Sequence, residues 1–271
     1  MNLDVSNVQY SNYDLSHKIN IPTKLTRELS YFSGIHWGDG HLGNPKKYYY
    51  SLEYAGHLID ESIFYRIFFV KLFKKLFNKN LRIYEIYRDS GDFLKLSTQS
   101  KGIFTFLSTS LNFPVGPKVN HLISSIILEP RFLNDFIRGL ADSDFCLTFK
   151  ERKNTYHSYP VISFNSSSFS LVSQINEKLL ELNFKTSTLF NFPKKRYEKT
   201  HISNQLEISG EYMLEKWMKT ISFNSRKHLT KYLVWKKFGF CPTHTNLPQR
   251  ELILKGDLDP YSFYKSFPKS L

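Results

Sequence analysis

Apolar residues recur at helical spacing in some segments of the chain and alternate with polar residues in others. The spacing of residues 25, 29, 32 and 35 predicts a helix that ends in a glycine cluster at residues 38, 40 and 43. Two further helices are predicted at about 61–77 and 101–111, and strands at about 48–54, 81–88 and 93–99. The turn Asp89-Ser90-Gly91-Asp92 joins the last two strands as a hairpin, and Gly43-Asn44-Pro45 interrupts the opening strand pair.

The same order of elements then returns, shifted by about 105 residues. Helices are predicted at about 131–143, 171–182 and 211–220, and strands at about 146–150, 160–165, 187–192 and 205–209. This repeat predicts an α+β fold of two αββαββα half-domains related by a pseudo-twofold axis. We expect a loose arm (1–22), a first half-domain (23–114), a linker (115–130), a second half-domain (131–222) and a basic C-terminal helix and tail (223–271).

Composition narrows the class of protein. The chain has 271 residues, 24 Phe and 17 Tyr, which excludes a disordered protein, and 37 Lys and Arg against 24 Asp and Glu, a formal charge of +13. That surplus favours a polyanionic partner such as nucleic acid. The two cysteines, Cys146 and Cys241, are too few for a disulfide framework or a CxxC zinc site. Without a signal peptide or a membrane-spanning stretch, we expect an intracellular protein, in the cytoplasm or an organellar matrix, and not a secreted one.

The two opening helices of the repeat end in similar residues. The first ends Gly34-Ile35-His36-Trp37-Gly38-Asp39, and the second ends Gly139-Leu140-Ala141-Asp142-Ser143-Asp144. Residues four apart share a helix face, so each helix carries a small-residue patch that allows close backbone approach. We therefore expect the helices to pair and to bring Asp39 and Asp144 side by side.

A pair of acids at two helix C-termini is electrostatically unfavourable. A helix C-terminus carries about half a negative charge, so each carboxylate there costs about 0.3–1 kcal/mol. One such Asp would be a solvated helix end, but two in matched register indicate a site for a divalent cation such as Mg²⁺, which prefers oxygen ligands.

These residues give the chain its resemblance to a known family. The chain resembles single-chain LAGLIDADG homing endonucleases, with two copies of the motif in one polypeptide, over about residues 25–245. The segments Ser100-Lys101-Gly102-Ile103 and Phe223–His228 are also similar to stretches common in such proteins. The resemblance implies motif helices packed at the interface of the two halves, and antiparallel sheets that form a saddle on the major groove of DNA.

The resemblance also implies an activity: a monomeric, site-specific, Mg²⁺-dependent double-strand DNA endonuclease of intron homing, cutting across the minor groove of a long asymmetric target. Asp39 and Asp144 would hold the metal with the main-chain carbonyls of Gly38 and Ser143. Lys101 and Asn165 are expected to assist catalysis. An intron RNA maturase, with intron RNA as partner, or a non-cleaving DNA-binding regulator on the same scaffold remains the alternative.

Basic residues on and beside the predicted strands are the candidates for DNA binding, although ordinary solvated strand faces would look similar. They are Lys46, Lys47, Arg82, Arg88 and Lys95 in the first half, and Lys150, Arg152, Lys153, Lys194, Lys195, Arg196 and Lys199 in the second.

Other signals near the motifs are weaker. Phe145 stands where the family has a closing glycine, and we expect backbone strain there if the position needs a positive φ, with a weakened second active site. Gly38–Gly43 matches GxGxxG, but a helix precedes it, which excludes a dinucleotide-binding turn. His36 and His41 flank Asp39 without a third His nearby, so roles other than metal ligation are favoured.

Overall fold

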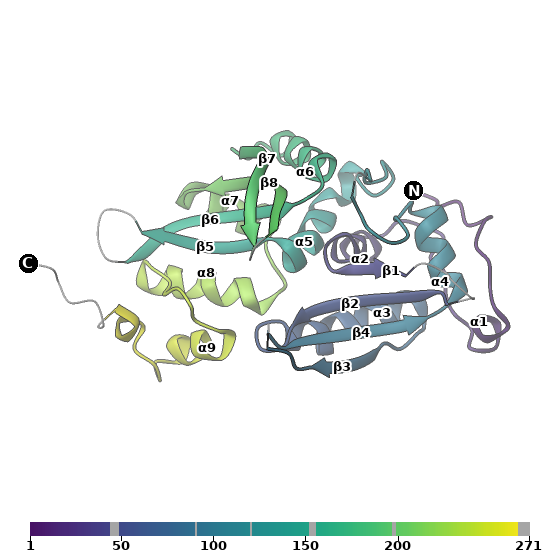
Figure 1. The fold of residues 1–271 in the computed structure, drawn as a ribbon, viewed down its shortest axis with the longest axis horizontal. Coiled ribbons are helices and arrows are strands. Elements are labelled where there is room, and N and C mark those ends of the chain that lie inside the picture. The colour runs from purple at the N-terminus through teal and green to yellow at the C-terminus, as the bar shows by residue number, and fades with distance from the viewer. Residues whose placement is uncertain (44–48, 90, 120, 152–155, 197–198, 265–271) are drawn as a thin grey trace, which may run out of the picture.

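A computed structural model describes residues 1–43, 49–89, 91–119, 121–151, 156–196 and 199–264 of the chain. It confirms an α+β fold built of two similar units (Figure 1). Each unit has a four-stranded antiparallel sheet, with the strand orders β1-β2-β4-β3 and β5-β6-β8-β7. The helices α2 and α5 lie next to each other between the two sheets, as Figure 1 shows.

The first half follows the predicted order. Its helices and strands are α2 (Arg27–Gly38), β1 (Gly40–Leu42), β2 (Ser51–His57), α3 (Val70–Phe77), β3 (Arg82–Ile86), β4 (Phe93–Gln99) and α4 (Lys101–Thr105). A π-helical segment (Phe64–Phe69) leads into α3, and a second one (Phe106–Ser110) follows α4. The short strand β1 completes the strand pair that the glycines around residue 43 obscured in the sequence.

The second half repeats this order with longer strands. Its elements are a 3₁₀ turn (Pro130–Phe132), α5 (Leu133–Asp144), β5 (Cys146–Glu151), β6 (His157–Ser166), α6 (Phe169–Glu181), β7 (Ser187–Arg196), β8 (Lys199–Ser209) and α7 (Glu211–Thr220). After it come α8 (Arg226–Phe238), α9 (Leu247–Lys255) and a 3₁₀ turn (Pro260–Tyr264). The sequence predicts α8 but not α9.

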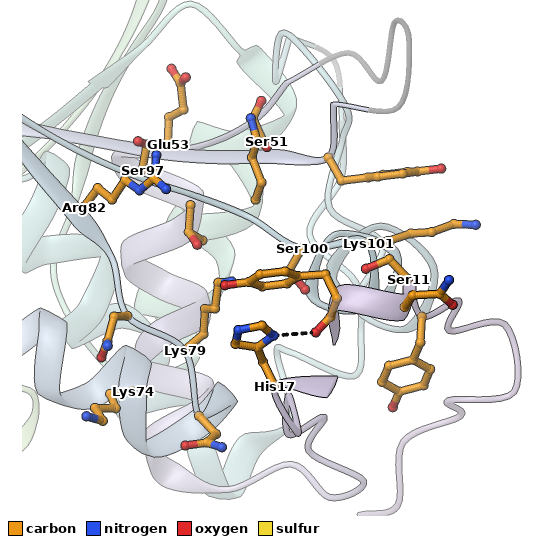
Figure 2. A pocket seen from close by; sticks show the side chains of 18 of the residues that line it. Ser11, His17, Ser51, Glu53, Lys74, Lys79, Arg82, Ser97, Ser100 and Lys101 are labelled. Carbon is orange, nitrogen blue, oxygen red and sulfur yellow. Dashed lines mark hydrogen bonds between the residues drawn. The ribbon is translucent and has the colours of Figure 1, made fainter. Parts of the chain in front are cut away.

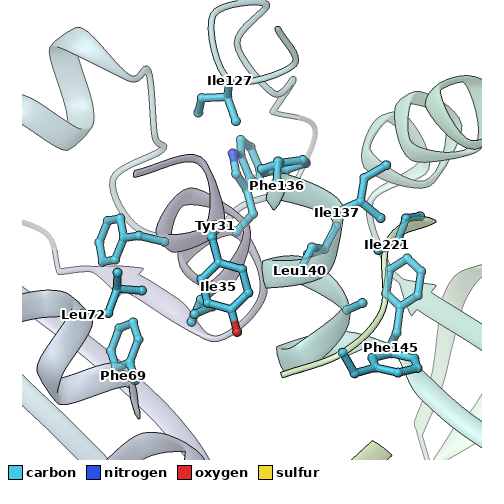
Figure 3. Close-up of a cluster of buried hydrophobic side chains, with 14 of the residues drawn as sticks. Tyr31, Ile35, Phe69, Leu72, Ile127, Phe136, Ile137, Leu140, Phe145 and Ile221 are labelled. Atoms are coloured by element: carbon cyan, nitrogen blue, oxygen red, sulfur yellow. The ribbon is translucent and has the colours of Figure 1, made fainter. Parts of the chain in front are cut away.

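The glycines of α2 and α5 allow the two helix backbones to touch. A Cβ atom on Gly34 would lie 2.1 Å from the carbonyl oxygen of Phe136, and one on Gly139 would lie 2.0 Å from that of Tyr31. These contacts are reciprocal, as a pseudo-twofold relation between the halves requires. Large apolar side chains such as Ile35 and Leu140 pack around the contact (Figure 3). The predicted close helix pair is therefore confirmed.

Each sheet has one face buried against helices and one face that is more open. Along β2, Leu52 and Tyr54 are buried, whereas Ala55 and His57 are exposed. The second sheet shows the same alternation on β5, where Leu147 is buried and Thr148 is exposed. Side chains of successive strand residues point to opposite faces, so the open faces present every second residue.

The N-terminal arm differs from its prediction as a loose segment. It contains α1 (Asn12–Ser16), and the Asp14 carboxylate accepts hydrogen bonds from Ser100 Oγ at 2.7 Å and Gly102 N at 3.0 Å. Asn20 N donates to the carbonyl oxygen of Phe77 at 3.0 Å. The arm was missed because long-range hydrogen bonds fix it, and such bonds leave no periodic pattern. Among the residues described, no helix is long and apolar enough to span a bilayer.

Candidate active site at the paired helix ends

Asp39 and Asp144 come together where α2 and α5 end. Asp39 follows the last residue of α2 and is half-buried, and Asp144 is the last residue of α5 and is exposed. A Cβ atom on Gly38 would lie 3.3 Å from Cγ of Asp144, so the second acid lies against the end of the first helix. The close contact at Gly34 and Gly139, one turn before the helix ends, sets the position of the two acids, since it lets both helices end at the same level.

The charged forms of the two acids are disfavoured where they lie. Burial raises the pKa of Asp39 well above its usual range, and the Asp144 and Glu61 carboxylates raise it further, although the hydroxyl of Tyr65 donates to Asp39 Oδ2. Although Asp144 as a whole is exposed, its carboxyl group lies against the end of α2, and the solvent lost there raises the pKa of Asp144, against the effect of Lys118 and Lys227. A cation between the two acids would remove this penalty.

Lys118 of the linker caps the first helix at the site. Its Nζ donates to the carbonyl oxygens of His36 at 2.8 Å, Trp37 at 2.7 Å and Gly38 at 2.7 Å. A cation is favourable at this negative helix end. Burial lowers the pKa of Lys118 to about 8, although the carboxylates of Asp144 and Asp39 oppose this shift. The Gly38 carbonyl, predicted as a metal ligand, therefore already accepts one hydrogen bond.

Lys227 of α8 approaches the acids from the C-terminal part of the chain. Its Nζ forms a largely buried ion pair with Glu61 Oε1 at 2.5 Å, and Glu61 Oε2 accepts from His57 N at 2.6 Å. Burial opposes the charge on Lys227, but the Glu61 carboxylate outweighs this effect and raises the pKa of Lys227. The acid pair is thus flanked by two ammonium groups, one from the linker and one from α8.

Asp142 positions the start of α8. Its buried carboxylate accepts from the hydroxyl of Tyr31 at 2.5 Å and from the backbone N–H groups of Asn224 and Ser225 at 2.9–3.0 Å. Burial raises the pKa of Asp142 to about 6, and these three donors hold its charged form. The acid inside the second motif therefore has a structural role, which places Lys227 at the site.

The strand register decides which predicted catalytic residues lie near the acids. Cys146 pairs with Ser163 and the rings of Phe145 and Phe164 stack at 4.8 Å, so Asn165 lies at the level of Asp144. In the first half Gly40 pairs with Tyr54, so Asp39, one residue earlier, lies at the level of Ala55, which pairs with Lys95. The structure thus brings Asn165 to the level of the acids, on the open sheet face. It also places Lys95, predicted only as a DNA contact, at the matching level of the other half.

Lys101 is not brought to the acids. It is the first residue of α4, beyond the end of β4, and lines a cavity that contains neither Asp39 nor Asp144. A direct role for Lys101 in chemistry at the acid pair therefore has no support from this placement.

The backbone conformation of Phe145 and the packing of His36 answer two questions that the sequence raised around the motifs. Phe145 has φ −81° and ψ 158°, an extended conformation, so the position does not need a positive φ and the backbone strain expected in that case does not arise. Its matching residue, Gly40, is required for space, because a Cβ there would lie 2.4 Å from His36 Nδ1. His36 is buried and hydrogen-bonded to the hydroxyl of Tyr54 at 2.9 Å, which explains it without metal ligation.

The predicted DNA-binding residues fall into four groups. Arg82, Lys95 and Lys150 alternate onto the open sheet faces, while Arg88, Lys194 and Lys195 are exposed on or beside strands. Lys95 and Lys150 form ion pairs with Glu53 and Glu207. Arg196 and Lys199 are the last and first residues of β7 and β8. Lys46, Lys47, Arg152 and Lys153 lie outside the described residues.

Sequence reasoning missed most of the residues around the acids. Lys118 lies in a linker without periodicity, and Glu61 and Tyr65 belong to an amphipathic segment in which they look like ordinary helix residues. Lys227 was visible as part of the basic run at 226–237, but nothing in the run distinguishes the lysine that reaches the acids from the others. In the part of the chain that is described, no three His, Cys, Asp or Glu side chains are arranged to hold a metal ion.

Replacing Lys118 should destabilise the fold. Lys118→Met keeps the apolar part of the side chain but removes the donor of three helix-end carbonyls, which should lower the free energy of unfolding by about 1–3 kcal/mol. Urea titration measures this change. Lys219→Met, at an exposed lysine of α7, is the matched control and should change stability by less than about 0.5 kcal/mol. Equal stability of both variants would show that the Lys118 cap contributes nothing.

Comparison with known proteins gives matches among solved structures. No protein-family model matches the chain, and a search of curated proteins finds no match. The homing endonuclease I-DmoI in complex with DNA and Mn is 15% identical, with a TM-score of 0.49, over 72% of this chain and 96% of that one. The chain is similar in structure to homing endonucleases.

Two other solved structures extend this comparison. The homing endonuclease I-WcaI, bound to its DNA recognition sequence, is 13% identical over 78% of this chain and 87% of that chain, with a TM-score of 0.47. Full-length DUF199/WhiA from Thermatoga maritima is 14% identical over 88% of this chain and 69% of that chain, with a TM-score of 0.46.

Proposed function

We propose that the chain is a divalent-metal-dependent DNA endonuclease that cuts both strands of a long asymmetric site as a monomer. The observation that carries this proposal is the convergence of Asp39 and Asp144 at two helix C-termini, one from each half, at the level of open sheet faces. The formal charge of +13 favours a nucleic-acid partner. I-DmoI and I-WcaI, to which the chain is similar, are described in complex with DNA.

The donor set at the helix ends fits a divalent cation. Two carboxylates and nearby main-chain oxygens are the hard ligands that Mg²⁺ prefers, and the two acids repel each other as they stand. Asp39 and Asp144 would hold the ion, with the Ser143 and Gly38 carbonyls as further oxygens, and structures of I-DmoI are described with Mn, Ca or Mg. When bound, the cation would polarise a scissile phosphate and activate water.

The remaining residues have supporting roles in this proposal. Lys118 and Lys227 would balance the charge of the acids and attract the phosphate. Tyr65 holds Oδ2 of Asp39 and so fixes the direction of that carboxylate. Asn165 and Lys95, at matching levels of the two open faces, would contact the DNA backbone on either side of the acids. Intron homing is the biological setting that this activity suits.

Cutting can be tested without knowledge of the target. The protein is incubated with a circular plasmid library carrying random inserts, in Mg²⁺ or in EDTA, and linear products are sequenced. We expect linear products only in Mg²⁺, with ends that map to one long asymmetric sequence cut on both strands. Linear products in EDTA, or no linear product in any divalent metal, would contradict the proposal.

A non-cleaving DNA-binding regulator is the second candidate. It is favoured by one observation: Lys118 and Lys227 already offset part of the charge of the acids without a metal. Specific binding of a library sequence that is never cut would support this candidate. An effect on the splicing of an intron RNA would support the maturase alternative.

A further inference from the structure

A cavity of about 1080 Å³ lies at the outer end of the first sheet, away from the acid pair (Figure 2). One wall is the N-terminal arm around α1, and the opposite wall consists of the ends of β2, β3 and β4. The last turn of α3, with the residues after it, and the start of α4 complete the lining. This cavity lies outside the site built from the motif helices.

The lining of the cavity is positively charged. Four cationic side chains contribute to it, namely Lys74, Lys79, Arg82 and Lys101 (Figure 2). Within the described ranges none of these four forms an ion pair with Asp or Glu, and the single acid of the lining, Glu53, is paired with Lys95 at 2.9 Å. Four cations without acidic partners around one cavity favour an anionic occupant.

Aromatic rings, rather than acids, position two of these lysines. Lys79 Nζ lies 4.0 Å from the ring centroid of Tyr13, which stacks on His17 at 3.8 Å. Lys101 Nζ lies 5.7 Å from the ring centroid of Tyr50. A cation–π contact orients an ammonium group but leaves its N–H donors available to a further partner. The lysines are therefore held in place with their donors still available.

The arm that closes the cavity is firmly attached. The Asp14 carboxylate bonds to Ser100 and Gly102 at the start of α4, and Asn78 Nδ2 donates to the carbonyl oxygen of Lys18 at 3.0 Å. Several carboxylate hydrogen bonds, those from Ser100 and Ser11 among them, outweigh burial and lower the pKa of Asp14, so its charged form is the one that is held. The cavity wall is thus formed before any ligand arrives.

The cavity continues the open face of the first sheet. Arg82, Tyr84 and Ser97 belong to both, since they lie on the open side of β3 and β4. Ala55, at the level of Asp39, is four residues from Ser51 of the lining, which is about 13 Å along the strand. That length corresponds to about four base pairs of DNA.

We propose that this cavity binds phosphate groups of the DNA backbone at the outer end of the half-site read by the first sheet. The inference rests on the proposed function and extends the footprint beyond the sheet faces to the N-terminal arm. The chemistry recognised is a phosphodiester, for which lysine and arginine donors are the usual partners.

Salt dependence of binding tests the proposal. A fluorescent random-sequence duplex of about 30 base pairs is titrated with the protein in EDTA at several salt concentrations. Each neutralised phosphate adds about 0.9 to the magnitude of the slope of log K against log salt. The triple variant Lys74→Ala, Lys79→Ala, Lys101→Ala should reduce this slope by about 2–3. The charge-matched control replaces Lys71, Lys219 and Lys255, exposed lysines outside the cavity, and should reduce it by less than about 1. Thermal melting checks that both triple variants fold. If the cavity variant does not fold, the single variant Lys74→Ala is used instead and should lower the magnitude of the slope by about 1.

The outcomes separate this inference from the proposed function. A slope lowered in the cavity variant alone supports the inference. Equal slopes in both triple variants overturn it and leave DNA binding intact, whereas a wild-type protein that binds no duplex at all overturns the proposed function as well. Inorganic phosphate and a single-stranded RNA of the same length are tested in parallel. If the cavity lysines matter for phosphate or RNA but not for the duplex, the occupant is a free anion or RNA, and the inference is wrong.

Discussion

Asp39→Asn and Asp144→Asn should each reduce the proposed double-strand cutting by roughly a thousandfold or more, because a bound metal would supply several kcal/mol and each 1.4 kcal/mol is tenfold in rate. Asparagine has the same shape as aspartate but cannot supply the negative charge that holds a divalent cation. DNA affinity should stay near the wild-type value, since neither change removes a cation. Plasmid linearisation and duplex binding in EDTA measure the two properties separately.

The expected change in stability distinguishes this result from simple unfolding. The raised pKa of Asp39 means that its charged form is disfavoured in the folded state, so Asp39→Asn should not lower the free energy of unfolding at neutral pH. Asp257→Asn, an exposed acid after α9, serves as the control and should cut normally. Cutting at the wild-type rate by both site variants would remove the basis of the mechanism.

Gly34→Ala and Gly139→Ala should each destabilise the fold by about 3 kcal/mol, the upper end of the usual cost of overpacking, because the contact is rigid. The new methyl group would meet backbone atoms of the partner helix at 2.0–2.1 Å, and a backbone cannot rotate away as a side chain can. Denaturant titration measures the loss, and cutting should fall with it because the helix ends carry the two acids.

Gly102→Ala is the matched control for this pair. It is also a helical glycine, but its Cβ would meet ring carbons of Tyr10 at 3.1–3.3 Å, and that side chain can shift. Alanine favours a helix over glycine by about 0.8–1.0 kcal/mol, so this variant should be neutral or slightly stabilised. If Gly139→Ala were as stable as Gly102→Ala, the two motif helices would not be in the close contact described.

The parts of the fold that the sequence predicts are those with local periodicity. The duplicated order of helices and strands, the pairing of α2 with α5 through small residues, and the meeting of Asp39 and Asp144 all follow from patterns within a few residues of each other. The ends of helices and strands differ from the predicted ends by a few residues, because tertiary packing decides where an element stops. The π-helical segments were not predicted.

The surroundings of the acids could not be predicted, because long-range contacts define them. Lys118 lies 80 residues from the Gly38 carbonyl that it caps, and Lys227 lies 166 residues from Glu61. The sequence could also not show whether the position of Phe145 needs a positive φ. Glycine at the matching position 40 is required because a Cβ there would meet the ring of His36, and not because of its backbone conformation.

The C-terminal segment connects both halves through buried polar groups. Arg250 of α9 is fully buried, donates to the hydroxyl of Thr230 at 3.0 Å, and pairs with Asp60 of the first half at 3.3 Å. Asp142 of the second half holds the start of α8. A chain cut back to the two similar units would therefore lose the ion pair between Arg250 and Asp60 together with Lys227, so the C-terminal segment supports both the fold and the surroundings of the acids.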